Sequence, residues 1–151
     1  AMPWMLISSG LLEGIGLVAL VLAISAQNIA IPISLPVTGL TLVAVNAVLW
    51  RNYVGNAQAN GIGPHSRAIL FSHTLKVHAI AHLFPALLLM LAIALPAVAA
   101  ILIGAAGVLV LIGGAYWKGL IITRACHQQG FAIAKFPQRG SGKYAAPTLE
   151  A

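Results

Sequence analysis

Four long stretches of mostly apolar residues dominate the sequence, separated by short polar or proline-containing segments. They run from about Met2 to Ala26, from Pro36 to Tyr53, from Leu75 (or from near Ser66) to Leu95, and from Ala97 to Ile122. About 20 mostly apolar residues suffice for a helix to cross a bilayer. The stretches lack the two-residue alternation of strands, and inside lipid a lone strand could not satisfy its backbone. The pattern therefore predicts an all-α membrane protein, a four-transmembrane-helix bundle with both termini on the same side.

The composition agrees with this prediction and excludes an ordinary soluble domain. Hydrophobic residues make up 60% of the chain and charged residues only 7%, whereas a soluble domain carries about 25% charged residues. Eight basic and two acidic residues give a formal charge of +6. These charges flank the apolar stretches and form no basic groove with aromatic residues, so we do not expect nucleic-acid binding.

The distribution of the basic residues predicts an orientation. The connection from Arg51 to Lys76 is basic, as is the chain from Lys118 onward, whereas the other two connections carry no Lys or Arg. Because positive loops stay inside, both termini and the Arg51–Lys76 connection are expected in the cytoplasm, in a multi-pass protein of the cell inner (cytoplasmic) membrane. Trp4, Trp50 and Trp117 fall on the same side, where they are expected at the lipid interface.

Two parts of the chain are distinguished by polarity. Residues 1–125 form the predicted transmembrane domain, and residues 126–151 form a polar tail too short to fold alone. The tail is expected to lie along the membrane surface or on a partner subunit. Cys126 is the single cysteine, so an internal disulfide is excluded and iron–sulfur ligation by this chain is not supported. No metal site and no catalytic residue are predicted.

Glu13 is the sharpest candidate for chemistry, because it is the only acidic residue before Glu150 and lies inside the first apolar stretch. A carboxylate there must be protonated, paired or next to water. It could relay protons or contact a quinone headgroup. Alternatively, it makes a structural hydrogen bond to Asn46 or to a serine. Asn46 itself is expected to hold helices together, or to line a cavity.

A second candidate group consists of His73, His78 and His82. His78 and His82 are four residues apart and therefore share one helix face. They could transfer protons, hydrogen-bond a quinone, ligate haem b, or serve only as hydrogen-bonding residues near the helix end. Axial haem ligands approach from opposite sides, so this pair alone is not expected to hold haem. A second ligand would have to come from His127 or from a partner.

Three segments resemble a known family. They are S-G-L-L-E-G (Ser9 to Gly14), A-V-N-A-V-L-W-R-N-Y (Ala44 to Tyr53), and the stretch from Tyr116 to Gly142 with R-A-C-H-Q-Q-G-F and P-Q-R-G. Together they resemble the carboxyl-terminal half of NrfD/DmsC-type subunits, the membrane anchors of polysulfide- and dimethyl-sulfoxide-reductase-like complexes. Typical members have about eight helices, twice the number predicted here.

The resemblance implies a haem-free anchor subunit of an oxidoreductase complex. Such an anchor exchanges electrons between menaquinone or ubiquinone and an iron–sulfur subunit, which serves a molybdenum- or tungsten-pterin catalytic subunit. Iron–sulfur and pterin groups would then belong to the partners alone. On this interpretation Glu13, His78 and His82 are the quinone and proton candidates, with Asn46 and His73 beside them. The alternatives are a b-type cytochrome anchor and a purely structural membrane subunit.

Overall fold

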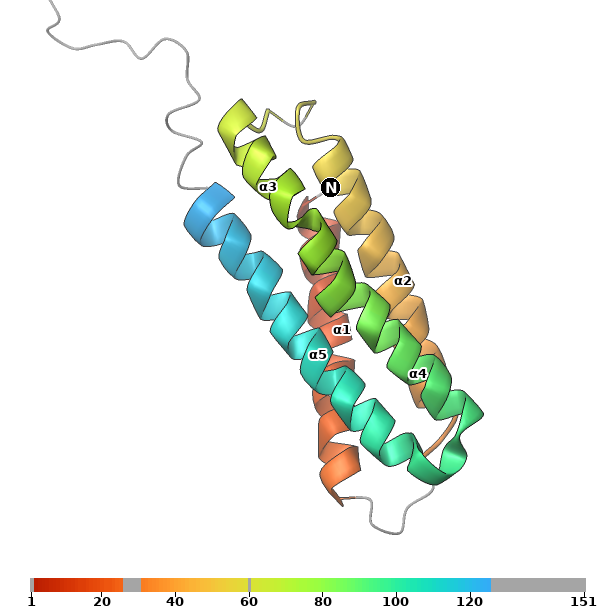
Figure 1. The fold of residues 1–151 in the computed structure, drawn as a ribbon. Helices are drawn as coiled ribbons and strands as arrows, with labels where there is room; N and C mark the ends of the chain where they lie inside the picture. Colours follow the sequence, from red (N-terminus) through yellow and green to blue (C-terminus); the bar gives the residue numbers. More distant parts are fainter. Residues whose placement is uncertain (1, 26–30, 60, 126–151) are drawn as a thin grey trace, which may run out of the picture.

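The computed structural model describes residues 2–25, 31–59 and 61–125, and these form an antiparallel bundle of four long helical segments (Figure 1). The segments are α1 (Met2–Ser25); α2 (Ser34–Gly55); α3 (Pro64–Val77) continued by η1 (His78–Leu83) and α4 (Phe84–Ala94); and η2 (Pro96–Val98) continued by α5 (Ala99–Leu120) and η3 (Ile121–Ala125). All four are long and apolar enough to cross a membrane. No strand occurs in the described ranges. The predicted four-helix membrane fold is confirmed.

Both ends of the described chain, Met2 and Ala125, lie at the same end of the bundle (Figure 1). We call it the terminal end. The expected position of the polar tail 126–151 lies outside the described residues.

The third segment begins well before Leu75, close to the alternative start near Ser66. Gly63 is extended and Pro64 takes the first helical position, where its missing N–H costs nothing and its fixed φ suits a helix. The first turns mix polar and apolar residues, which is why an apolar run alone places the start too late. The helical segment therefore spans 31 residues from Pro64 to Ala94.

The third and fourth segments are longer than a bilayer requires. At a rise of about 1.5 Å per residue, their 31 and 30 residues extend over about 45 Å, against a hydrocarbon core of about 30 Å. They join at Pro96, at the end opposite the termini, and their other ends lie together at the terminal end. There the Ser66 hydroxyl donates a hydrogen bond of 2.8 Å to the Ala125 carbonyl and joins the two helices.

A π-helical turn interrupts the third segment at His78–Leu83, directly before Pro85. The Phe84 N–H donates to the carbonyl of Ala79, five residues earlier. In a regular α-helix the ring of Pro85 would collide with the carbonyl four residues before it. The wider π turn relieves this collision.

Two hydrophobic clusters form the core. The one at the terminal end contains Trp50, Tyr53 and Trp117, and the other, toward Pro96, is aliphatic. Trp50 and Trp117 are only 1% and 2% exposed, and their rings lie 6.0 Å apart. These two tryptophans therefore do not contact lipid, and their level in the membrane stays a prediction. They face the inside of the bundle because the neighbouring helices are close enough to enclose them, whereas Trp4 is exposed as expected.

Helices α1 and α5 pack with their backbones in contact. A methyl group built on Gly107 would collide with the carbonyl of Gly16. Glycine allows this approach because it has no side chain, as is common where membrane helices cross. The close crossing brings the polar residues of α1 within reach of α5.

Candidate functional site

A continuous line of hydrogen bonds crosses the bundle from α1 through α2 to η1, and we call it the histidine network. The Ser8 hydroxyl donates to the Met5 carbonyl at 3.1 Å. The Asn46 amide donates to Ser8 Oγ at 2.9 Å, and Asn46 Oδ1 lies 3.0 Å from His82 Nε2. Ser8, Asn46 and His82 are all buried. Three helical segments are thus joined through polar atoms inside the bundle.

This arrangement defines the state of the His82 ring. The Asn46 amide nitrogen faces Ser8, so its carbonyl oxygen faces His82, and a carbonyl only accepts hydrogen bonds. His82 Nε2 therefore donates, which in a neutral imidazole leaves Nδ1 as an acceptor. Among the described residues no hydrogen-bond partner reaches this buried Nδ1. His82 thus has a lone pair inside the bundle that can accept a proton or a hydrogen bond.

His78 lies next to His82, one turn nearer the terminal end. The two ring centroids are 5.2 Å apart, with the planes tilted by 51°. His78 is half-buried whereas His82 is buried. One ring therefore lies at the edge of the bundle and the other lies inside it. The sequence prediction that these histidines share a face holds even though the turn is π-helical.

His73 belongs to a separate contact between α3 and α5. Its Nδ1 and the Tyr116 hydroxyl share a hydrogen bond of 2.6 Å. The structure therefore brings His78 and His82 together with Asn46, while His73 pairs elsewhere.

Glu13 forms an ion pair with Lys118. Lys118 Nζ lies 2.7 Å and 2.8 Å from the two carboxylate oxygens, and the Ser9 hydroxyl donates to Glu13 Oε1 at 2.8 Å. Side chains on helices lean toward the helix N-terminus, so on these antiparallel helices the two lean toward each other. Neither the direct Asn46 bond nor protonation is needed to accommodate the carboxylate. Of the alternatives that the sequence leaves open for Glu13, pairing with a cation and a hydrogen bond from a serine are both observed.

Gly114 on α5 makes room for this carboxylate. A methyl group built at Gly114 would overlap with Glu13 Oε1. The adjacent residues Ser8 and Ser9 connect the two polar groups of the bundle, because Ser8 belongs to the histidine network and Ser9 holds Glu13. Both groups therefore lie at neighbouring levels of α1.

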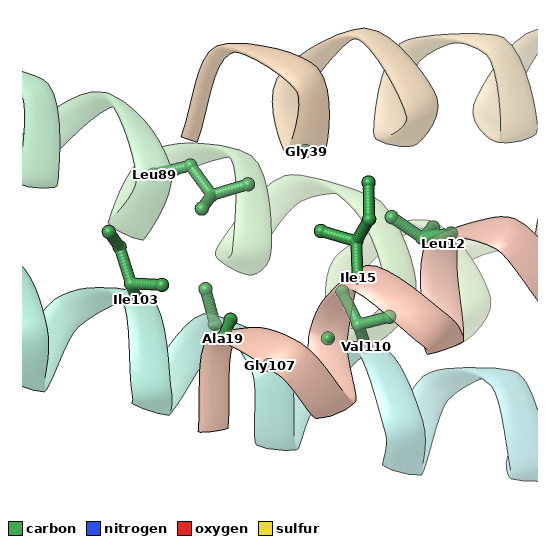
Figure 2. Close-up of a pocket in the computed structure, with 10 residues that line it drawn as sticks. Leu12, Ile15, Ala19, Gly39, Leu89, Ile103, Gly107 and Val110 are labelled. Atoms are coloured by element: carbon green, nitrogen blue, oxygen red, sulfur yellow. The ribbon is translucent and has the colours of Figure 1, made fainter. Parts of the chain in front are cut away.

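None of the candidate residues lines the small apolar pocket that lies between the helices. Figure 2 shows this pocket between α1, α2, α4 and α5, with only aliphatic side chains and glycines around it. Its volume of about 10 Å³ would admit at most one water molecule. A cavity of this size is too small for any cofactor.

Three participants, Lys118, Ser8 and Ser9, are not singled out by the sequence. From the sequence alone, Lys118 is interpreted as an interfacial anchor because it lies near the end of an apolar stretch. The available signal was that a buried acid needs a cation, and that Lys118 lies within the last predicted helix. Which helices are neighbours is not contained in that signal.

Comparison with known proteins gives no relative for this chain. No family model matches it, and neither a curated protein nor a solved structure shows significant similarity. The resemblance to NrfD/DmsC-type anchors thus stays a prediction.

Proposed function

We propose that this protein is a membrane anchor that exchanges protons and hydrogen bonds with a quinone in a multi-subunit oxidoreductase. The observation that supports the proposal is the buried His82 with its free Nδ1 lone pair beside half-buried His78. Ionisable side chains inside membrane bundles are costly and commonly mark proton or ligand paths. The proposal also follows the resemblance noted in the sequence.

The chemistry requires protonatable groups near the quinone. Quinone reduction takes up two protons and quinol oxidation releases two, and an apolar helix surface can do neither. His78, at the edge of the bundle, would meet the headgroup from the lipid side. His82 behind it would accept a proton at Nδ1 while Asn46 holds the ring through Nε2. Glu13, paired with Lys118, would accept a proton as the pair separates.

The electron carriers would belong to partners. An iron–sulfur subunit would pass electrons to or from a pterin-containing catalytic subunit, and this chain would hold both at the membrane. In this proposal the protein lies in the inner membrane of the cell, and the terminal end of the bundle faces the cytoplasm because basic residues gather there. These residues are Arg51, Arg67, Lys76 and Arg124. The substrate would be determined by the catalytic partner.

The test uses the complex purified in detergent from its native membrane. Mass spectrometry should find iron–sulfur and pterin subunits with this chain. His78→Gln and His82→Gln should each lower quinol turnover about tenfold or more, since a positioned acid or base contributes at least that much. His65→Gln, at an exposed position outside the histidine network, serves as control. Copurification of no redox subunit, or unchanged turnover in both variants, would refute the proposal.

Glu13→Gln provides a second, independent measurement. Glutamine can still accept the Ser9 hydrogen bond but cannot bind a proton. Turnover should fall while the subunits still copurify. If turnover is unchanged, Glu13 has no part in the mechanism.

The same preparation tests the alternative that the protein is a b-type cytochrome anchor. The His78 and His82 rings lie side by side at 5.2 Å, which leaves no space for a macrocycle between them. A haem on either ring would need its second ligand from outside the described residues. A reduced-minus-oxidised spectrum with a haem Soret band would favour that rival over quinone contact.

A further inference from the structure

The Glu13–Lys118 ion pair is partly exposed at the middle of the bundle. Glu13 is the twelfth of 24 residues in α1, about 17 Å along a helix of about 36 Å. The Lys118 and Glu13 side chains are 31% and 24% exposed. Centred in a bilayer, this level is surrounded by lipid tails, where exposed charge is expensive. The ion pair therefore calls for a polar neighbour at its outer side.

The residues around the exposed ion pair are small. Gly10 and Gly14 form a G-x-x-x-G pattern on α1, both are exposed, and a methyl group on either would meet no atom within 4 Å. Ala115 is exposed on α5. We call Gly10, Glu13, Gly14, Ala115 and Lys118 the α1–α5 edge. Such positions let another helix approach closely, in contrast to Gly16 and Gly107, whose space is already filled within the bundle.

We propose that the α1–α5 edge binds a second copy of this chain, related by a two-fold axis along the membrane normal. The edge carries one charge of each sign, side by side on two helices. A two-fold rotation reverses their order, so Glu13 of each copy faces Lys118 of the other. Four alternating charges would then be enclosed by protein, as self-complementary contacts of symmetric dimers permit. This inference is independent of quinone chemistry.

The charges of the α1–α5 edge indicate which molecule binds there. Glu13 is the single carboxylate side chain among the described residues, and the ion pair as a whole is neutral. Lipid headgroups lie at the surface and not at this depth. A different transmembrane segment would have to bring its own matched pair of charges, whereas a second copy brings them by symmetry.

The first test exchanges the two charges. A Glu13→Lys/Lys118→Glu variant retains the pair within each chain and in its own dimer. In a mixed dimer with the wild-type protein, however, like charges would face each other. Coexpression of differently tagged chains, followed by two-step affinity purification in detergent, should recover mixed pairs about tenfold less than pairs of either kind alone, because facing like charges are strongly unfavourable. Equal mixing, or monomers throughout, would overturn the proposal.

The second test does not depend on the folding of that variant. In a Cys126→Ser background, one tagged copy carries Gly10→Cys and a differently tagged copy carries Ala115→Cys. A short bismaleimide reagent added to native membranes should link the two tags covalently, since α1 of one copy faces α5 of the other. Gly55→Cys replaces Gly10→Cys in the control, because Gly55 is likewise exposed and open. No linkage between tags, or linkage only to another protein, would overturn the proposal.

Discussion

Gly114 lies so close to the carboxylate of Glu13 that even a methyl group at position 114 would overlap with Oε1. Glycine, which has no side chain, thus leaves room on α5 for the one acidic residue in the described part of the bundle. The ion pair with Lys118, about one helical turn further along α5, depends on this space. The stability of the bundle should therefore be sensitive to volume at position 114.

Gly114→Ala should destabilise the bundle although alanine is the better helix former. Overpacking costs about 1–3 kcal/mol, and the helix propensity of alanine returns about 1 kcal/mol. We expect a net loss of up to about 2 kcal/mol in unfolding by SDS. Gly119→Ala, on the same helix with open space at its Cα, should be neutral or stabilising. Equal stability of the two variants would contradict the tight contact.

The ion pair should appear as a coupling energy. Lys118→Met leaves the carboxylate without its cation, and Glu13→Gln leaves the ammonium without its anion. The double variant should be less destabilised than the sum of the two, by about 1–3 kcal/mol. Unfolding free energies of the four proteins form the cycle. Additive losses would show that Glu13 and Lys118 do not interact.

Asn46→Leu should weaken the contact between α1, α2 and η1. It removes the donor to Ser8 and the acceptor for His82, and a buried polar group left without a partner costs about 1–3 kcal/mol. Hydrogen bonds between membrane helices average lower, so a loss of about 1–2 kcal/mol is expected. Thr41→Val is the control, because Thr41 bonds only within its own exposed helix turn. A similar loss in both would deny Asn46 its bridging role.

Gly107→Ala should have the largest effect of the glycine substitutions. The added methyl would meet the backbone of Gly16, which cannot rotate away as a side chain can, so the two helices must separate. We expect a loss of about 2 kcal/mol or more. Thermal unfolding in detergent measures it, with Gly55→Ala as a substitution at an open glycine. A wild-type melting temperature for Gly107→Ala would contradict the backbone contact.

The helices could be predicted because their signal is local. Apolar length alone identifies four spans, and the observed helices overlap all of them. The alternative start near Ser66 lies within two residues of the observed start at Pro64, whereas the start at Leu75 is too late because α3 begins with turns that mix polar and apolar residues.

The site could be predicted only residue by residue. Glu13, Asn46 and His82 stand out because polar side chains are rare in such stretches, but their partners are set by which helices touch and at what level. Ser8 and Ser9 illustrate the difference: although adjacent in sequence, Ser8 bonds Asn46 on α2 whereas Ser9 bonds Glu13 on its own helix. No pattern in a single stretch contains that information.

The π turn at His78–Leu83 also sets the rotational phase of everything before it. A π turn holds about one residue more than an α turn, and each residue of an α-helix rotates the following face by about 100°. Deleting one residue there would restore a regular helix but swing α3 about its axis by roughly that angle. Leu70 and Ser66 would leave their places against the neighbouring helices. The chain is therefore expected to tolerate a changed side chain at Ala79 far better than a shortened one.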